Sequence, residues 1–119
     1  MCIRDRSGLP PVTDIGRSLD EDSGLILLDP GTGERILAWA ELDARSEASG
    51  RHLLLIHPAR VLPEGGRIIV ALRSPVDTEG RSIESSAVFA ALRDRIPTTN
   101  PLIEERRPAM ERILSLIHI

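Results

Sequence analysis

Histidine, carboxylate and serine side chains are the groups of this chain that could perform chemistry, and the two histidines of its middle region are considered first. His52 and His57 flank an apolar run, residues 53–56. Their odd spacing places them on opposite faces of a regular strand, so they could not bind one metal ion together. No cysteine or carboxylate stands beside them at the spacing of a zinc site. We interpret both as structural or surface residues rather than zinc ligands.

Carboxylates near the predicted strand ends and turns could bind calcium, as the loops of some extracellular β domains do. They lack the spacing of an EF-hand loop, and their oxygen atoms cannot be placed from sequence. The run Asp-Thr-Glu-Gly at residues 77–80 is more simply a turn. Calcium therefore stays an alternative to plain turns. The carboxylates concerned are Asp29, Glu34, Glu41, Asp43, Asp77 and Glu79.

The remaining motifs that could bind or react are weak. The run Gly-Thr-Gly at 31–33 resembles a phosphate-binding turn, but it leads into another predicted strand, which favours a hairpin turn. No serine lies in Gly-x-Ser-x-Gly, so no nucleophile elbow is predicted. We interpret Trp39 as a core or interface anchor rather than a ligand platform. The sequence thus assigns no catalytic, cofactor-binding or metal-binding residue.

Composition excludes several classes of protein. The net charge of −3 lacks the basic character of a nucleic-acid-binding protein. All basic residues other than histidine are arginine, and the only cysteine is Cys2, so no internal disulfide is expected. No apolar run approaches the roughly 18 residues of a membrane span.

Two hairpins are predicted to position these groups. In the first, residues 24–29 and 34–42 form strands around the turn at 30–33. Trp39 and Glu41 share one face of the second strand with Arg35 and Leu37, and the opposite face carries Ile36, Ala38, Ala40 and Leu42. In the second hairpin, residues 52–57 pair with residues 67–73 through a loop at 58–66. Residues 7–23 are predicted to be an irregular lead-in.

The period of the apolar residues changes after Ser82 and predicts two helices. Residues 86–95 form the first, capped by Glu84, Ser85 or Ser86. The second begins at Pro101 or Leu102, with Asn100 as its N-cap, and runs towards Ile113. Pro108 leaves two alternatives open, a kink or a later helix start at Pro108 itself. Apolar surface is expected around Phe89, Leu92 and Met110.

Both ends of the chain resemble translated sequencing adapter. Residues 114–119 match a translation of the transposase mosaic-end adapter used in library preparation, and residues 1–6 match a translation of its reverse complement. We therefore expect residues 1–6 and 114–119 to be an adapter artefact and leave them out of the fold prediction. Residues 7–113 are then expected to be an internal segment of a longer protein.

The middle of the chain resembles a bacterial Ig-like module of the S-layer type. Such modules combine an I-x-P strand end, an L-x-P-G-x-x-Y-x-V hairpin and a D-x-x-G turn. Here IHP stands at residues 56–58, LPEGGRIIV at 62–70 and DTEG at 77–80. Arg67 and Ile68 stand where tyrosine is usual. The predicted fold is mainly β with C-terminal α: a partial antiparallel Ig-like β-sandwich over residues 7–83, then one or two connector helices over 84–113.

A wider resemblance suggests a function. The runs LLD at 27–29, TGER at 32–35, WAELD at 39–43 and VFAALRD at 88–94 are similar to the N-terminal region of large secreted bacterial proteins whose downstream part resembles an α/β-hydrolase, as in extracellular lipases. The resemblance implies a non-catalytic accessory domain, an extracellular or cell-envelope location, and the protein's own downstream domain as partner. The catalytic nucleophile of that family would lie beyond Ile113, so no catalytic residue is carried over.

Two alternatives stay open. The chain could be a structural or binding module of a cell-envelope protein with no enzyme attached. It could also line part of an enzyme's active site, in which case His52, His57 or Asp77 would face a cleft.

Overall fold

The computed structural model describes residues 9–45, 52–77 and 79–117. The chain divides into two compact units, Met1–Ser82 and Ile83–Ile119. The first contains the strands that the structure describes, and we call it the β unit. The second contains the α-helices, and we call it the helical unit.

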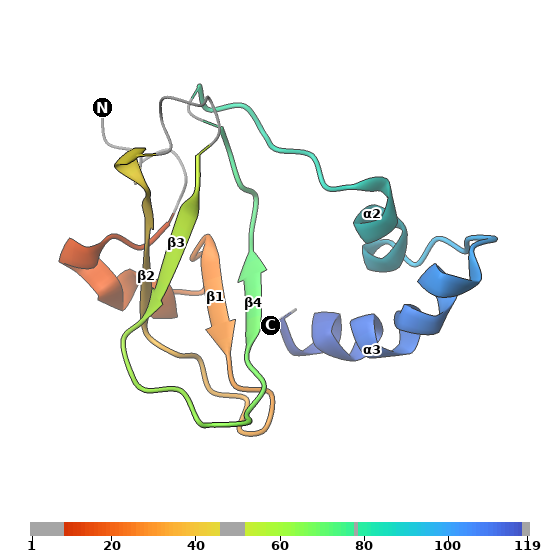
Figure 1. Ribbon diagram of the computed structural model, residues 1–119, viewed down its shortest axis with the longest axis horizontal. Coiled ribbons are helices and arrows are strands. Elements are labelled where there is room, and N and C mark those ends of the chain that lie inside the picture. The colour runs from red at the N-terminus through yellow and green to blue at the C-terminus, as the bar shows by residue number, and fades with distance from the viewer. Residues whose placement is uncertain (1–8, 46–51, 78, 118–119) are drawn as a thin grey trace. The chain divides into compact units, whose positions relative to one another are not determined.

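The described strands of the β unit form two antiparallel pairs (Figure 1). They are β1 (Leu25–Leu28), β2 (Ala38–Leu42), β3 (Leu54–Pro58) and β4 (Ile69–Leu72). β1 pairs with β4, and β2 pairs with β3. The predicted second hairpin, residues 52–57 with 67–73, is therefore wrong. Its two strands exist in shortened form, but each has a partner from the first predicted hairpin.

The predicted turn between the first two strands is confirmed. The amide of Asp29 donates to the carbonyl of Glu34 at 2.9 Å, and the amide of Gly33 donates to the carbonyl of Asp29 at 2.8 Å. Gly33 has a φ of 73°, a left-handed conformation that favours glycine. An isolated bridge between Leu28 and Arg35 continues the pairing beyond the turn, although β2 itself starts only at Ala38.

The backbone hydrogen bonds place β1 between two neighbours, which explains the correction. On one edge, Gly24 accepts from the amide of Arg73 at 2.9 Å, next to β4. On the other, Leu27 accepts from the amide of Ile36 at 2.9 Å. The strands thus form two separate sheets, β1-β4 and β2-β3, and only the residues just before β2 pair with β1. β3 pairs with β2 instead, so the two strands of the predicted second hairpin do not pair with each other.

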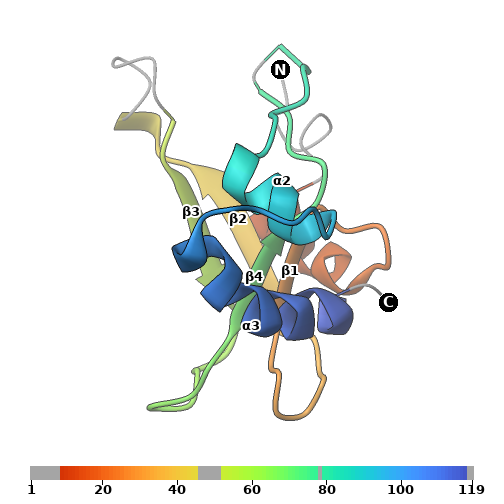
Figure 2. The ribbon, with the colours of Figure 1, turned by 90° about the vertical axis from the view of Figure 1, so that its right-hand side faces the viewer.

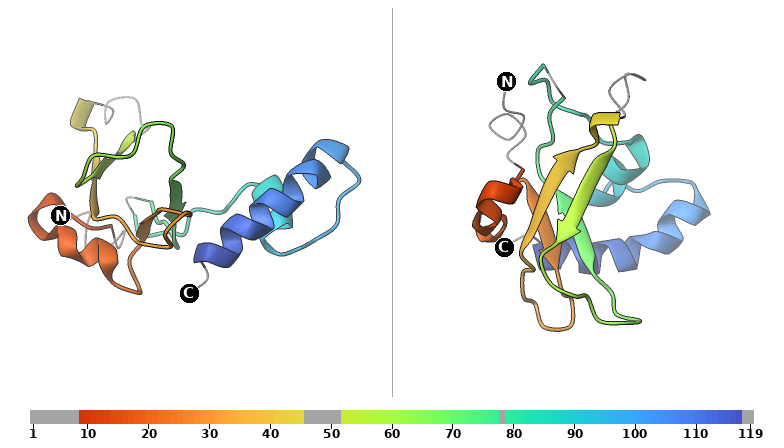
Figure 3. Two further views of the ribbon diagram at one scale, coloured as in Figure 1. Left: turned by 90° about the horizontal axis from the view of Figure 1, so that it is seen from below. Right: turned by 60° about the vertical axis from the view of Figure 1, so that its left-hand side comes forward.

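The core of the β unit lies between the two strand pairs (Figure 3). Ile36, Ala38 and Ala40, which the prediction grouped on one face without assigning that face to the core, are buried with Leu25 and Leu27 of β1. Burying a leucine or isoleucine side chain contributes about 1.5–3 kcal/mol. Partly buried apolar side chains complete this core, namely Leu9, Leu54, Ile56, Leu62 and Ile68.

The lead-in is more ordered than predicted. It contains η1, a 3-10 helix over Val12–Leu19. The Ser18 hydroxyl accepts from the amide of Ala38 at 3.1 Å, and the carbonyl of Pro10 accepts from the amide of Ala40 at 2.9 Å. These backbone donors of β2 point away from β3 and need partners. The lead-in supplies them, a requirement that is visible only once the pairing of β2 is known.

The helical unit begins with α2 (Ala87–Arg93). Ser86 is its N-cap, because its hydroxyl accepts from the amide of Phe89 at 3.2 Å. This selects Ser86 from the three predicted caps. The helix ends at Arg93, earlier than predicted. Phe89 is exposed as expected, whereas Leu92 is buried, contrary to the expectation of an exposed apolar surface there.

The second helix, α3, spans Pro101–Ile117. The predicted cap is confirmed, since the Asn100 side-chain oxygen accepts from the amide of Leu102 at 3.0 Å. Pro108 lies inside the helix, so the alternative start at Pro108 is wrong. The helix also includes residues 114–117, which the adapter interpretation leaves out. Figure 2 shows how residues 94–100 join α2 to α3.

The described helices are too short or too polar to cross a bilayer.

Candidate functional site

The outer face of the β2–β3 pair carries three side chains that we call the Trp39 patch: Trp39, Glu41 and His57. Trp39 and Glu41 lie two residues apart on β2, so they share a face as predicted. His57 lies directly opposite Trp39 in the register of the pair. The prediction could not bring His57 to this face, because it paired β3 with the wrong strand.

The side chains of the Trp39 patch contact one another. The indole of Trp39 and the imidazole of His57 are stacked, with 4.8 Å between ring centroids and 14° between ring planes. The Nε2 atom of His57 lies 3.0 Å from Oε1 of Glu41. An ionised carboxylate can only accept, so Nε2 carries the proton of this hydrogen bond. One edge and one face of the imidazole are thereby fixed.

A carboxylate that orients an imidazole is also found in enzymes that activate a nucleophile. Such a mechanism needs a hydroxyl or thiol on the second imidazole nitrogen. In the part of the chain that the structure describes, Glu41 is the one side chain hydrogen-bonded to His57. The geometry is therefore that of a cross-strand pair, which stabilises the sheet face.

Next to the patch lies an open, shallow hollow of about 580 Å³. Its lining joins Trp39 to η1 and to the residues at and after the end of β3, and consists of Ile15, Trp39, Pro58, Ala59, Arg60 and Val61. Trp39 is half-buried here and lies outside the core cluster. Its interpretation as a core residue is therefore wrong, which leaves an interface anchor or a ligand platform.

His52 is not part of the patch. It is exposed and lies before β3, which begins at Leu54. The prediction that His52 and His57 lie on opposite faces of one strand therefore does not apply. The structure does not bring His52 and His57 together on one strand.

Most of the carboxylates considered for calcium make contacts with nearby protein groups. Asp29 accepts from the amide of Gly31 at 2.8 Å within its turn. Asp77 accepts from the amide of Arg81 at 2.9 Å, and this bond lowers the pKa of its carboxyl. Arg81 also pairs with Asp77 and Glu79. Among residues 9–45, 52–77 and 79–117, no group of three or more potential metal ligands comes together.

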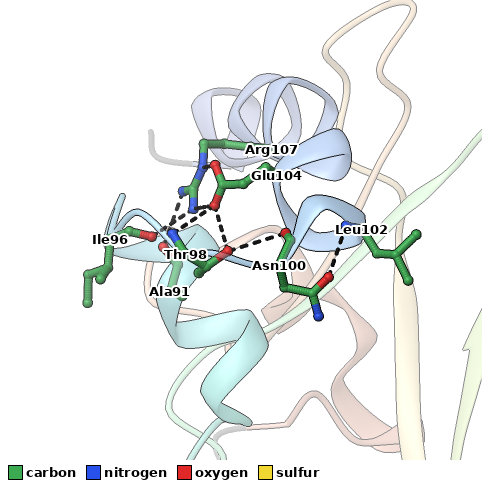
Figure 4. A network of polar contacts seen from close by, with 7 residues as sticks. All are labelled: Ala91, Ile96, Thr98, Asn100, Leu102, Glu104 and Arg107. Atoms are coloured by element: carbon green, nitrogen blue, oxygen red, sulfur yellow. Dashed lines mark hydrogen bonds and ion pairs between the residues drawn. The ribbon is translucent and has the colours of Figure 1, made fainter.

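The helical unit contains a second polar cluster, centred on Arg107 (Figure 4). Both carboxylate oxygens of Glu104 accept from the Arg107 guanidinium at 2.8 Å. The guanidinium also donates to the carbonyl of Ile96 at 2.7 Å and to that of Ala91 at 3.4 Å. Thr98 donates to Glu104 through its hydroxyl at 2.7 Å. One arginine thus connects α3 to the end of α2.

These contacts shift the pKa values of both charged groups, Glu104 and Arg107. The hydrogen bond from Arg107, supported by those from Thr98, lowers the pKa of Glu104 to about 2. The pKa of Arg107 is raised in return, mainly by its hydrogen bond to Glu104. The spacing of Glu104 and Arg107, three residues on one helix, is a sequence signal for such a pair. The contacts to Thr98 and Ile96 required the fold.

No family model, curated protein or solved structure matches this chain.

Proposed function

We propose that the chain is a non-catalytic Ig-like accessory domain with a helical connector, from a larger secreted bacterial protein whose downstream domain is an α/β-hydrolase. The observation that carries the accessory role is that two antiparallel strand pairs, β1-β4 and β2-β3, enclose one apolar core. Two sheets packed on a shared core are the basic arrangement of a β-sandwich. The resemblance of the sequence to such secreted proteins supports the hydrolase partner.

The division of the chain supports the same proposal. The β unit has its own apolar core, and the helices belong to a separate compact unit. A domain with its own core can fold without the part of the protein that performs the chemistry. The helices would then lead to the next domain.

A test of the non-catalytic role uses the only histidine–carboxylate pair of the described residues. We expect the full chain to hydrolyse p-nitrophenyl acetate and p-nitrophenyl butyrate no faster than buffer does. His57→Ala is the matched variant. Turnover that is present in the wild type and lost in His57→Ala would overturn the proposal and make the Trp39 patch an active site.

A second candidate is a binding module of a cell-envelope protein, which the exposed Trp39 patch and its hollow favour. Sequencing the gene at its own locus, past the codon for Ile113, separates the two candidates. A downstream Gly-x-Ser-x-Gly motif between a strand and a helix supports the hydrolase partner. A series of further β modules supports the binding module.

A further inference from the structure

Glu41 and His57 of the Trp39 patch together offer two kinds of donor atom that bind transition-metal ions. Imidazole nitrogen and carboxylate oxygen are both common ligands of such ions in proteins. Near His57 in the sequence, no carboxylate stands at the spacing of a metal site. The pairing of β2 with β3 supplies one from 16 residues away. The fold therefore creates a donor pair that spacing along the chain does not predict.

The separation of the two donor atoms fits a single metal ion. Nε2 of His57 lies 3.0 Å from Oε1 of Glu41. Two ligand atoms that each lie about 2.1 Å from an ion are about 3.0 Å apart at the right angle of tetragonal coordination, and about 3.4 Å apart at the tetrahedral angle. The pair therefore matches tetragonal coordination without widening. With nitrogen and oxygen ligands, this geometry is typical of copper(II) and nickel(II).

Both donors are oriented by the fold and open to solvent. The indole of Trp39 stacks on the imidazole, with 4.8 Å between ring centroids, and limits rotation of the His57 ring. The side chain of His57 is 36% exposed and that of Glu41 is 54% exposed, so an ion from solution reaches them and keeps water as its other ligands. Glu41 and His57 are the only titratable residues of β2 and β3. Neither strand therefore brings a cation that competes for the carboxylate.

Binding of an ion requires a change of tautomer and no net release of a proton. The hydrogen bond to Glu41 places a proton on Nε2 of His57. When an ion takes the lone pair of Nε2, that proton moves through water to Nδ1 of the same ring. In the part of the chain that the structure describes, Nδ1 makes no hydrogen bond to another protein group. It can then donate to water, as the second nitrogen of a metal-bound histidine usually does.

We propose that Glu41 and His57 form a copper(II) site on the outer face of the β2–β3 pair, with water in the remaining positions. The usual order of affinities favours copper(II) over nickel(II) and zinc(II) at nitrogen and oxygen donors. Calcium needs six or more oxygen ligands, which this pair does not provide. Among the described residues the site has two protein ligands, fewer than a zinc centre has. Its affinity is therefore lower, and its open positions accept a further donor.

The test titrates copper(II) sulfate into the full chain at constant pH and follows the fluorescence of Trp39, the only tryptophan. Cys2, the only cysteine, is first alkylated so that its thiol neither binds nor reduces the ion. Copper(II) on His57 lies next to the indole, so we expect saturable quenching that EDTA reverses. Electron paramagnetic resonance should show tetragonal copper(II) with nitrogen coordination. Absence of saturable quenching at millimolar copper(II) would overturn the proposal.

Three variants locate the site. His57→Gln removes the imidazole and should abolish the saturable quenching. Glu41→Gln keeps the size of the side chain but loses the anionic donor, so the affinity for copper(II) is expected to fall about tenfold or more. His52→Gln is the matched control, because His52 is exposed and lies before β3, and it should bind copper(II) as the wild type does. Urea unfolding followed by Trp39 fluorescence checks that each variant is folded.

Two further outcomes contradict the proposal. Equal copper(II) affinity of folded Glu41→Gln and the wild type would mean that an exposed imidazole binds the ion alone, without a site built by the strand pair. Quenching that persists in His57→Gln, or that is lost in His52→Gln, would place the ion elsewhere on the chain.

Discussion

The β unit and the helical unit are stabilised by different kinds of contact. In the β unit, Leu25, Leu27 and Ile36 are buried in a shared apolar core. In the helical unit, the ion pair of Arg107 and Glu104 binds the ends of both helices, while several apolar side chains stay exposed. These are Val88, Phe89, Ile96 and Leu102. The β unit should therefore respond mainly to cavities, and the helical unit to changes in charge and capping.

The largest effect is expected from Leu25→Ala, which leaves a cavity in the core of the β unit. Leu25 is fully buried, and such truncations cost about 2–5 kcal/mol of unfolding free energy. Urea unfolding followed by fluorescence measures it, because Trp39 is the only tryptophan and lies in the β unit. Leu53→Ala is the control, since Leu53 is mostly exposed. A loss below about 1 kcal/mol would show that the core does not close around Leu25.

Arg107→Met should have the next largest effect, confined to the helical unit. The variant keeps a long apolar stem but loses the bonds to Glu104, Ile96 and Ala91. We expect a lower helical signal in far-ultraviolet circular dichroism and an unchanged midpoint of the Trp39 transition. Arg106→Met, at the exposed neighbouring position, should change neither signal. If the two variants have the same helical signal, the Arg107 cluster does not stabilise the connection.

The same comparison shows which features could be predicted from sequence. Signals confined to a few residues were sufficient for the turn at 30–33 and for the Asn100-Pro101 helix start, and they narrowed the cap of the first helix to Glu84, Ser85 or Ser86. Alternation along the second strand also grouped Ile36, Ala38 and Ala40 on one face, although it did not show that this face is buried. Each of these depends on neighbours in sequence.

Partner choice between strands could not be predicted in this way. Residues 52–57 and 67–73 are adjacent and both strand-like, so a hairpin was the simplest prediction. In the folded chain, Leu62 of the loop between them and Ile68 at the start of the second segment are instead partly buried against the core. The contact of His57 with Glu41, and the acceptors that Ser18 and Pro10 offer to β2, depend on that long-range pairing. The Trp39 patch was therefore missed as a cluster, although Trp39 and Glu41 were assigned to the same face.

Ser86→Ala should have a smaller effect, because it removes one cap from one short helix. The lost acceptor for the Phe89 amide costs about 1 kcal/mol at a typical N-cap. Circular dichroism should show a modest decrease in helical signal. Ser86→Asn keeps a side-chain oxygen at this position and should restore the wild-type signal. Failure of asparagine to restore it would mean that the hydroxyl acts through another contact.

The smallest effect is expected from acid, and it tests the charged contacts of the helical unit. The hydrogen bonds from Arg107 and Thr98 lower the pKa of Glu104 from 4.5 to about 2 in the folded helical unit. The unfolded chain has the higher pKa, so the ionised carboxylate stabilises the fold at pH above about 4.5. That contribution decreases as the pH falls and is lost below about 2.

Two variants isolate this contribution in a pH titration of the helical signal. Glu104→Gln cannot ionise, so its signal should vary less than that of the wild type between about pH 4.5 and 2. Asp94 also has a lowered pKa, because its carboxylate accepts a hydrogen bond from Arg93, and Asp94→Asn removes that second titration. Glu104→Gln in the Asp94→Asn background should leave the helical signal nearly independent of pH in this window. A wild-type acid dependence that persists in the double variant would assign the effect to another group and would contradict the charge-based account of the helical unit.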